Sequence, residues 1–313
     1  MKNNYVKSTL EATVNLQIKE SELLAHHTSF GIGGPAAFYV EVSEPDDLVS
    51  LLKATRILNI PRLIIGGGTN LLVSDLGFDG VVIRTGFNGI KISGDQRSVK
   101  VGASVKSAAL VEYLVVEGLA GLEFAAGLPG TIGGAITGNA GCFGSSLGER
   151  LTEAVVVFSD GSPQKIVDNT WFDFGYRRSA LHDIGAVIVE ATFAIEPGDA
   201  AHLQEISAGH IETRKTKHPS LAVKTAGSYF KNLPAPKFAQ RRVAAGSFLD
   251  QIGAKQMSVG DAAVFEKHAN IVINKGSARA ADVLLLTSQM AKKVKDAFGV
   301  VLEPEVRFVG EKP

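Results

Sequence analysis

The chain has 313 residues, 45% of them hydrophobic and 20% charged, which is ordinary for a globular protein of two or three domains. It has no apolar run of about 18 residues and no signal-peptide core, which excludes a membrane-spanning helix, and its single cysteine, Cys142, excludes an internal disulfide. The net charge is zero, but residues 201–313 carry 17 Lys and Arg against 10 Asp and Glu, an excess too scattered for nucleic acid that favours a small phosphorylated or carboxylated ligand.

The first part of the chain predicts a small α/β lobe. Residues 37–42 are expected to form a strand, followed by a helix with Ser43 as its N-cap, Pro45 in its first turn and an apolar face that ends at Leu58. Strands at 62–65 and 81–85 then complete a βαβ-like unit. We expect this lobe to span residues 1–88.

Two further lobes follow. In residues 89–198 strands dominate; the expected elements are a strand at 98–103, a helix at 105–117, and strands at 154–158 and 187–195. A turn cluster at 196–201 marks the boundary. Residues 199–313 predict an α+β lobe, with helices at 201–217, 245–252 and 278–298, a helix stop at Gly299, and strands at 271–274 and 306–309.

A glycine-rich run, residues 121–148, is the most informative stretch. It has eight glycines between Gly127 and Gly148 and one charged residue, Glu123. Bare backbone of this kind brings N–H groups close to phosphate oxygens. A mobile linker is the alternative, but linkers have few apolar residues and this run has many. The composition favours a packed loop that faces a ligand.

A second glycine loop, residues 66–71, follows the strand at 62–65 directly. Its sequence GGGTNL has the layout of an anion cradle, although a tight turn without a ligand explains it equally well when it is taken alone. Together the two loops fit one long ligand with a diphosphate, such as FAD. The pattern Gly31-x-Gly33-x-x-Ala36 precedes its strand, so we reject a Rossmann fingerprint, and no P-loop motif is present.

Four stretches offer side chains for chemistry. In residues 174–179 an arginine suits a substrate carboxylate, and the alternative is a surface pair of arginines. In residues 226–232 a sterically open serine is an acid only with help from nearby charge, and the alternative is a turn serine. Residues 302–307 place two acids around a proline, or form an internal ion pair. For residues 266–270, EKHAN, we expect a solvated loop.

Taken together, these stretches resemble the UDP-N-acetylenolpyruvoylglucosamine reductase (MurB) family. The matching segments span residues 28–310 in family order: TSFGIGGPA, IIGGGTNLLVSD, GLEFAAGLPGTIGGAITGNAG, FGYRRSAL, AGSYFKN, FEKHANIVIN and LEPEVRFVG. The glycine loops alone are shared with other FAD proteins; AGSYFKN and LEPEVRF make the match specific. The resemblance implies an α+β fold, with a two-lobed FAD-binding domain of the vanillyl-alcohol-oxidase/PCMH type and an α+β substrate domain.

The resemblance also implies a reaction. NADPH reduces a non-covalently bound FAD, a hydride passes from flavin N5 to the alkene of UDP-N-acetylglucosamine enolpyruvate, and the neighbouring carbon is protonated to give UDP-N-acetylmuramate for peptidoglycan. Arg177 would stabilise the enolate, Ser228 would deliver the proton, and Glu305 would assist. We further expect a cytoplasmic monomer that binds neither nucleic acid nor membrane and holds no metal.

The family positions carry over to further residues. For FAD they are Gly66, Gly67, Gly68, Thr69, Asn70, Leu71, Gly127, Pro129, Gly130, Thr131, Gly133, Gly134, Asn139, Ala140 and Gly141. For the substrate they are Tyr176, Lys217, Tyr229 and Asn232, where Tyr229 is a guess at a replacement for a tyrosine loop that this chain lacks. The chain departs from the family at Leu233, where a proline is usual.

Two other functions are compatible with these residues. A sugar or alcohol oxidase on the same FAD scaffold would consume oxygen and often carries a tethered flavin. A UDP-sugar-binding protein without catalysis would keep the fold alone. The joint presence of Arg177, Ser228 and Glu305 favours the reductase.

Overall fold

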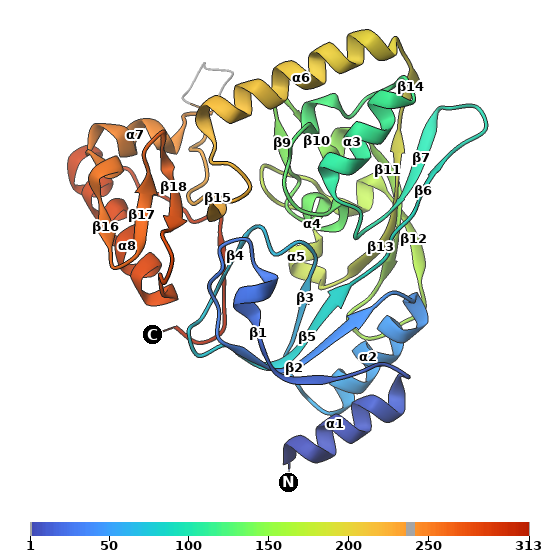
Figure 1. Cartoon of the computed structure of the whole chain (residues 1–313). Helices are drawn as coiled ribbons and strands as arrows, with labels where there is room; N and C mark the ends of the chain where they lie inside the picture. The colour runs from blue at the N-terminus through green and yellow to red at the C-terminus, as the bar shows by residue number, and fades with distance from the viewer. Residues whose placement is uncertain (1, 236–241, 313) are drawn as a thin grey trace. The chain divides into compact units, whose positions relative to one another are not determined.

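The computed structural model describes residues 2–235 and 242–312, and the chain divides into two compact units. The first unit consists of residues 1–22, 37–67 and 79–213, and the second of residues 23–36, 68–78 and 214–313. Two short segments of the N-terminal region therefore pack with the C-terminal part of the chain. Figure 1 shows the elements along the chain by colour.

The first unit contains two larger β-sheets and the helices that pack against them. Its helices are α1 (Lys2–Thr13), α2 (Pro45–Ile57), α3 (Ser107–Val116), α4 (Ile132–Thr137), α5 (Leu181–Ile184) and most of α6 (Ala200–Lys217). Its strands are β1 (Lys19–Leu23), β2 (Pro35–Val42), β3 (Arg62–Ile65), β5 (Phe78–Thr85), β6 (Ile90–Ile92), β7 (Ser98–Gly102), β8 (Leu119–Ala120), β9 (Gly141–Cys142), β10 (Ser145–Ser146), β11 (Leu151–Val157), β12 (Lys165–Asp168), β13 (Val187–Ala194) and β14 (Glu196–Pro197).

The first sheet confirms the predicted βαβ-like unit. Its strand order is β1-β2-β5-β3; helix α2 connects β2 to β3 across the intervening β5, and β3 pairs with β5 in parallel. The helix begins one residue later than predicted, because its N-cap is Glu44, in extended conformation, and Pro45 occupies the first turn. The predicted N-cap, Ser43, is therefore wrong. Helix α1, which the sequence did not predict, contributes the buried Val6 and Leu10 to the same core.

The second sheet is antiparallel, with the order β12-β11-β13-β7-β6. Strand β13 lies at its centre, and the side chains of Val187, Ala191 and Phe193 are buried because both faces of the strand are covered. The glycine-rich run packs here through α4, which contacts β7 and β13. The second sheet thus packs against the glycine-rich run, which the sequence predicted to face a ligand.

The second unit is built around the antiparallel sheet β15-β18-β17-β16. Its elements are β4 (Leu71–Val73), β15 (Lys224–Ser228), α7 (Ala245–Gln251), β16 (Ser258–Val259), β17 (Ala262–Phe265), β18 (His268–Asn274), α8 (Ala280–Phe298) and β19 (Arg307–Val309). Helices α7 and α8 lie beside this sheet (Figure 1). Helix α8 buries Val283, Leu286, Met290 and Val294 at helical spacing. It ends at Gly299 (φ 67°), which confirms the predicted stop.

The two short N-terminal segments join the second unit through backbone pairing. Strand β4 pairs in parallel with β19, so that residues 71–73 lie opposite residues 307–309. Asp75 accepts hydrogen bonds from the first N–H groups of α8, those of Ala280 (2.8 Å) and Ala281 (3.1 Å). The N–H of Gly34 donates to the carbonyl of Ser74 at 2.8 Å. The contacts of β4 with β19 and of Asp75 with α8 cross more than 200 residues of chain, so local sequence patterns do not reveal them.

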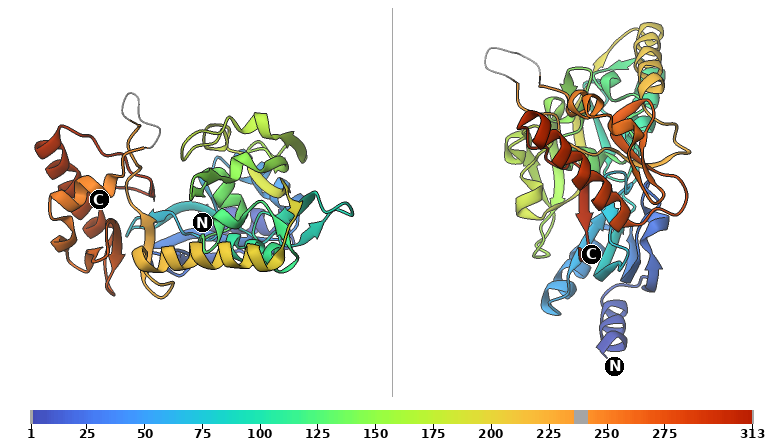
Figure 2. Two further views of the ribbon diagram at one scale, coloured as in Figure 1. Left: turned by 90° about the horizontal axis from the view of Figure 1, so that it is seen from above. Right: turned by 90° about the vertical axis from the view of Figure 1, so that its left-hand side faces the viewer.

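The predicted lobe boundaries and the compact units differ in two respects. The predicted boundary after residue 88 falls between the two sheets of the first unit, which are together in one unit. The predicted boundary after residue 198 precedes α6, whereas the unit boundary lies inside α6, after residue 213. Figure 2 shows α6 as one straight helix. Among the described residues, no helix is both long and apolar enough to cross a bilayer.

Candidate active site

The two glycine loops are in contact within the first unit. A Cβ atom added to Gly67 would lie 3.0 Å from the Cα of Gly130, and one added to Gly66 would collide with Oγ1 of Thr131. Backbones approach this closely only where side chains are absent. The structure therefore brings together the two loops that the sequence predicted would share one ligand, although they lie some sixty residues apart in the chain.

The loop that follows β3 has the free donors that an anion site needs. The backbone N–H groups of residues 66–70 donate no hydrogen bond to any residue in the described part of the chain. Gly68 has φ 61°, and a Cβ there would collide with the carbonyl of His27. Consecutive N–H groups in such a turn form a concave site for phosphate oxygens. These residues fit the diphosphate of FAD.

The glycine-rich run is packed, so the alternative of a mobile linker is wrong. Leu122, Ile132, Ile136 and Leu147 are all at most 2% exposed. The N–H of Ile132 donates to the carbonyl of Val105 and that of Gly133 donates to the carbonyl of Ala103, so the run is fixed to the segment that follows β7. Gly130 and Thr131 of this run lie next to Gly66 and Gly67 of the neighbouring loop.

Asn139 joins the glycine-rich run to the arginine segment at residues 174–179. It is 9% exposed and has φ 40°, an αL conformation that asparagine tolerates. Its Oδ1 accepts from the N–H of Gly148 at 3.1 Å, and its Nδ2 donates to the carbonyl of Gly175 at 3.0 Å. Both polar atoms of the side chain thus bind protein. We infer that Asn139 shapes the loop through these two bonds.

The two adjacent arginines have different surroundings. Residues 175–178 form a tight turn in which Arg177 has φ 54°, and its Nη2 donates to the carbonyl of Gly141 at 3.1 Å. The guanidinium lies 5.3 Å from the ring centre of Tyr176. Arg178 is exposed and pairs with Asp183 at 2.9 Å. Of the two arginines, Arg177 bonds the glycine-rich run and Arg178 bonds Asp183.

A buried serine holds this arginine turn in place. Ser179 is completely buried, and its hydroxyl donates to the carbonyl of Thr137, the last residue of α4, at 2.7 Å. The bond fixes the end of the turn to the glycine-rich run from a second point. The sequence analysis did not single out Ser179; its place two residues after Arg177 was the available signal.

In the second unit, Ser228 ends strand β15. It is half-buried, it pairs with Ile271 across the sheet, and its hydroxyl has no hydrogen-bond partner among the described residues. The preceding Gly227 has φ 79°, a conformation that turns the strand at this point. The small residues that the sequence analysis noted before Ser228 are therefore part of this turn.

Asn270 fixes the chain immediately after Ser228. It is 2% exposed, its Oδ1 accepts from the N–H of Phe230 at 2.9 Å, and its Nδ2 donates to the carbonyl of Phe230 at 2.8 Å. The prediction of a solvated loop at residues 266–270 is wrong here, because Asn270 lies in β18, a central strand of the sheet. The prediction of a solvated loop is correct for Glu266 and Lys267, which are exposed between β17 and β18.

Glu305 lies next to the serine segment in the second unit. Its N–H donates to the carbonyl of Tyr229 at 2.7 Å, and Lys231 donates to the carbonyl of Glu303 at 2.8 Å. The two segments also form a bridge at Phe230 and Pro304. The half-buried Glu305 and Ser228 are therefore positioned by one continuous stretch of backbone pairing.

The other predicted substrate residues differ in their placement. Asn232 accepts at Oδ1 from the N–H of Ala245, at the start of α7, and Leu233 uses its N–H, which a proline lacks, to bond Val243 at 2.9 Å. Tyr229 is 5% exposed and its hydroxyl bonds Thr287 in the core, where burial raises its pKa. This placement does not fit a substrate contact. Lys217 is the last residue of α6.

Two histidines pack against each other beside Lys217. The ring centres of His218 and His268 are 5.5 Å apart. Burial, with additional repulsion from Arg214, His268 and Lys217, lowers the pKa of His218 to about 4. Burial also lowers the pKa of His268. Both imidazoles are therefore neutral at physiological pH, so the positive charge in this part of the molecule comes from arginine and lysine.

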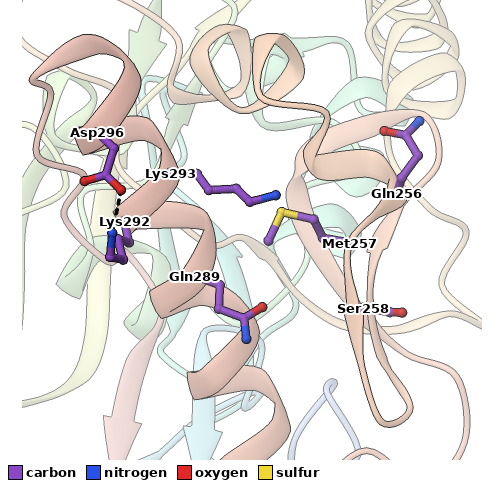
Figure 3. A pocket seen from close by; sticks show the side chains of 7 residues that line it. All are labelled: Gln256, Met257, Ser258, Gln289, Lys292, Lys293 and Asp296. Carbon is purple, nitrogen blue, oxygen red and sulfur yellow. Dashed lines mark hydrogen bonds and ion pairs between the residues drawn. The ribbon is translucent and has the colours of Figure 1, made fainter.

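A separate hollow in the second unit lies between α8 and the residues before β17. It has a volume of about 490 Å³ and is shown in Figure 3. Lys293 extends across it toward Met257, whereas Lys292 pairs with Asp296 at 2.6 Å. None of the predicted site residues lines it. Lysines on an exposed helix do not define a ligand, so we assign this hollow no role.

Comparison with known proteins agrees with the geometry of both units. Residues 36–166 match the family model of an FAD binding domain, and residues 218–309 match that of the C-terminal domain of UDP-N-acetylenolpyruvoylglucosamine reductase. These matches place the glycine loops and the serine and histidine segments in separate domains. The first begins near β2 and the second directly after α6.

Close relatives cover almost the whole chain. The UDP-N-acetylenolpyruvoylglucosamine reductase of Geobacter metallireducens is 38% identical over 310 residues, which is 99% of each chain. Reductase 2 of Symbiobacterium thermophilum is 37% identical over 95% of this chain and 94% of its own. The crystal structure of the reductase MurB from Thermus caldophilus has 30% identity and a TM-score of 0.79, over 94% of this chain and all of that one. The predicted α+β, FAD-binding fold class is confirmed.

Proposed function

Because the chain belongs to the UDP-N-acetylenolpyruvoylglucosamine reductase family, we propose that it reduces UDP-N-acetylglucosamine enolpyruvate to UDP-N-acetylmuramate with NADPH as the reductant. The observation that carries this proposal is the contact between the two glycine loops, with five consecutive N–H groups available in one of them. The reaction supplies a peptidoglycan precursor, and we place it in the cytoplasm, catalysed by a monomer.

FAD is the cofactor, held without a covalent bond. The N–H groups of residues 66–70 would bind its diphosphate, with the backbone of residues 127–134 beside them. When bound, FAD supplies the hydride that the alkene of the substrate accepts. The close approach of Gly67 to Gly130 supports one shared ligand for the two loops.

Arg177 would carry the electrostatic part of the reaction. Addition of hydride to the alkene leaves negative charge on the neighbouring carbon and its carboxylate. A guanidinium stabilises such charge with two parallel N–H donors, and one fixed before the reaction needs no reorganisation when the charge develops. The bond from Nη2 to Gly141 and the stacking on Tyr176 fix this guanidinium in advance. Tyr176 would serve the substrate through the same contact.

Ser228 would deliver the proton to the carbon that becomes negative. Its hydroxyl has no protein partner in the described ranges, so its proton is available to a substrate. Glu305, fixed next to this strand, would assist by orienting the groups that surround the serine. Lys217 and Asn232 would bind the substrate from the same unit, whose excess of basic residues suits a nucleotide sugar.

Assays of NADPH oxidation, of oxygen consumption and of nucleotide-sugar binding test the proposal. The purified protein should be yellow and should oxidise NADPH only when UDP-N-acetylglucosamine enolpyruvate is present, with one UDP-N-acetylmuramate formed for each NADPH consumed. Oxygen consumption with peroxide formation from a sugar would indicate an oxidase instead. Binding of the nucleotide sugar without NADPH oxidation would indicate a binding protein. Either result would overturn the proposed function.

A further inference from the structure

We propose that Asn70, at the end of the first glycine loop, positions Glu305, and that it acts on substrate reduction through this contact. This inference deepens the proposed function and rests on it. The side-chain Nδ2 of Asn70 donates to the carbonyl oxygen of Glu305 at 3.1 Å. The backbone carbonyl of Asn70 accepts from the N–H of Arg307 at 3.0 Å. Asn70 thus bonds the glutamate segment with both its side chain and its backbone.

The opposite side of Glu305 is bonded to the serine segment. The N–H of Glu305 donates to the carbonyl of Tyr229 at 2.7 Å, and the N–H of Val306 reaches the same oxygen at 3.4 Å. Tyr229 is the residue after Ser228. The main chain of Glu305 therefore lies between two partners, with its N–H bonded to the serine segment and its C=O bonded to Asn70. All of these residues belong to the second unit.

The side chain of Asn70 bonds the glutamate segment at the residue where the backbone pairing of that segment changes from one partner to another. The segment changes partners at Glu305, because Pro304 has no N–H to donate and the parallel pairing of β19 with β4 begins only at Arg307. The carbonyl of Glu305 lies between these two stretches of backbone pairing. The Asn70 amide bonds this carbonyl directly, whereas the backbone of Asn70 holds the segment only two residues further on, at Arg307.

This contact gives Asn70 a role different from the one the sequence predicted. A cofactor-binding asparagine offers its side-chain amide to FAD, whereas here Nδ2 is directed at Glu305. The N–H of Asn70 belongs to the donor row at residues 66–70 and still suits the diphosphate. Loss of the side-chain amide should therefore displace Glu305 and leave the reduction of the flavin by NADPH intact.

The test uses Asn70→Asp, which keeps the shape of the side chain and removes the donor, beside Asn70→Ala. With FAD bound at saturation both variants should keep near wild-type flavin reduction by NADPH, because the backbone N–H of residue 70 remains; FAD affinity is compared in Asn70→Ala, which adds no carboxylate beside the diphosphate donors. Reoxidation of the reduced flavin by the enolpyruvyl sugar should slow by about 10- to 100-fold, the cost of a small misplacement of a catalytic group. Weakened FAD binding with slowing of both half-reactions would overturn the inference.

A double substitution separates positioning from other roles. If Asn70 acts through Glu305, then Asn70→Asp should slow reoxidation little further in a Glu305→Gln background. If the two effects on rate multiply, Asn70 acts independently and the inference is wrong. Asn88→Asp is the matched control, because the Asn88 side chain is exposed and donates only to the nearby carbonyl of Gly86.

Hydrogen exchange gives a readout that does not depend on turnover. In Asn70→Asp the amide hydrogens of residues 305–307 should exchange faster than in the wild type, while those of β17 and β18 should not change. Unchanged protection at residues 305–307 would contradict the inference even if activity fell. If the wild type itself does not reduce the enolpyruvyl sugar, the proposed function fails, and this measurement still decides whether Asn70 positions Glu305.

Discussion

Arg177 donates from Nη2 to the carbonyl oxygen of Gly141 at 3.1 Å while its own backbone adopts φ 54°. A residue with a Cβ pays about 1–2 kcal/mol for the left-handed conformation. The surrounding bonds, from Asn139 to Gly175 and from Ser179 to Thr137, hold the turn in this state. A strained turn that is fixed on both sides is typical of functional sites, and here it directs one arginine to the glycine-rich run.

Arg177→Lys should lower the rate of substrate reduction by about 10²–10³-fold, because lysine cannot provide a planar pair of donors for the developing charge. Flavin reduction by NADPH should be close to wild type. The measurement is single-turnover reoxidation of the reduced flavin by the enolpyruvyl sugar. Arg178→Lys is the matched control and should change this rate little, because Arg178 is exposed and pairs only with Asp183. Equal losses in the two variants would argue against the assignment.

Ser228→Ala should lower substrate reduction by about 10²–10⁴-fold, the usual contribution of a positioned acid. Removing one hydroxyl leaves the fold and the flavin loops unchanged, so NADPH should still reduce the flavin at the wild-type rate. Stopped-flow absorbance separates the two half-reactions. Ser288→Ala, in an exposed position of α8, is the control. Wild-type turnover by Ser228→Ala would show that another group delivers the proton.

Gly67→Ala should weaken FAD binding. Its Cβ would lie 3.0 Å from the Cα of Gly130 and would push the two loops apart. Overpacking of this kind costs about 1–3 kcal/mol, which corresponds to a loss of about 10- to 100-fold in affinity if it falls on the bound state. The measurement is titration of flavin-free protein with FAD.

The control for that substitution is Gly209→Ala. Gly209 lies in the exposed part of α6, with no atom near its added Cβ. Alanine should stabilise the helix there by about 0.5–1 kcal/mol and leave FAD affinity unchanged. Equal FAD affinity in Gly67→Ala and the wild type would mean that the contact between the loops is not part of the cofactor site.

The stability of the second unit should decrease between pH 6.5 and about 4. In this range the unfolded chain protonates His218 at its ordinary pKa of 6.5, but burial keeps the folded pKa at about 4, so acid favours unfolding. His218→Gln should reduce this pH dependence. The measurement is urea unfolding at several pH values, followed by circular dichroism, because the single tryptophan, Trp171, lies in the first unit.

His202→Gln is the control for the pH experiment. The side chain of His202 is 68% exposed, so its replacement should leave the pH dependence as in the wild type. A His218→Gln variant with the same loss of unfolding free energy toward low pH as the wild type would show that other groups cause the effect. A stability that rises as the pH falls through this range would contradict the burial of His218.

Local patterns predicted the long elements well and missed those that depend on distant contacts. Strand β3 was predicted at its observed residues, because three apolar residues, 63–65, precede a glycine loop. Helix α1 was missed because its composition is polar, and its buried hydrophobic side chains in the described part of the chain, Val6 and Leu10, are too few for a clear helical pattern. Strand β18 was predicted only from Ile271, because the charges of EKHAN suggested exposure although Asn270 is buried.

The candidate site was predictable in its residue types and not in its connections. Spacing could not separate Arg177 from Arg178, because the difference lies in bonds to Gly141 and Asp183. Nor could it assign Asn70 to Glu305, since the two are 235 residues apart in the chain. Family resemblance supplied the roles of Ser228 and Glu305. The structure adds the backbone pairing that brings their segments together.

The central claim is that residues 66–70 and the glycine-rich run bind one FAD together. Titration of the flavin-free protein with FAD, followed by the visible absorbance of the flavin, tests it most directly. The account predicts saturation at one FAD per chain, with all colour released into the supernatant on acid precipitation. A protein that stays colourless with excess FAD would contradict it.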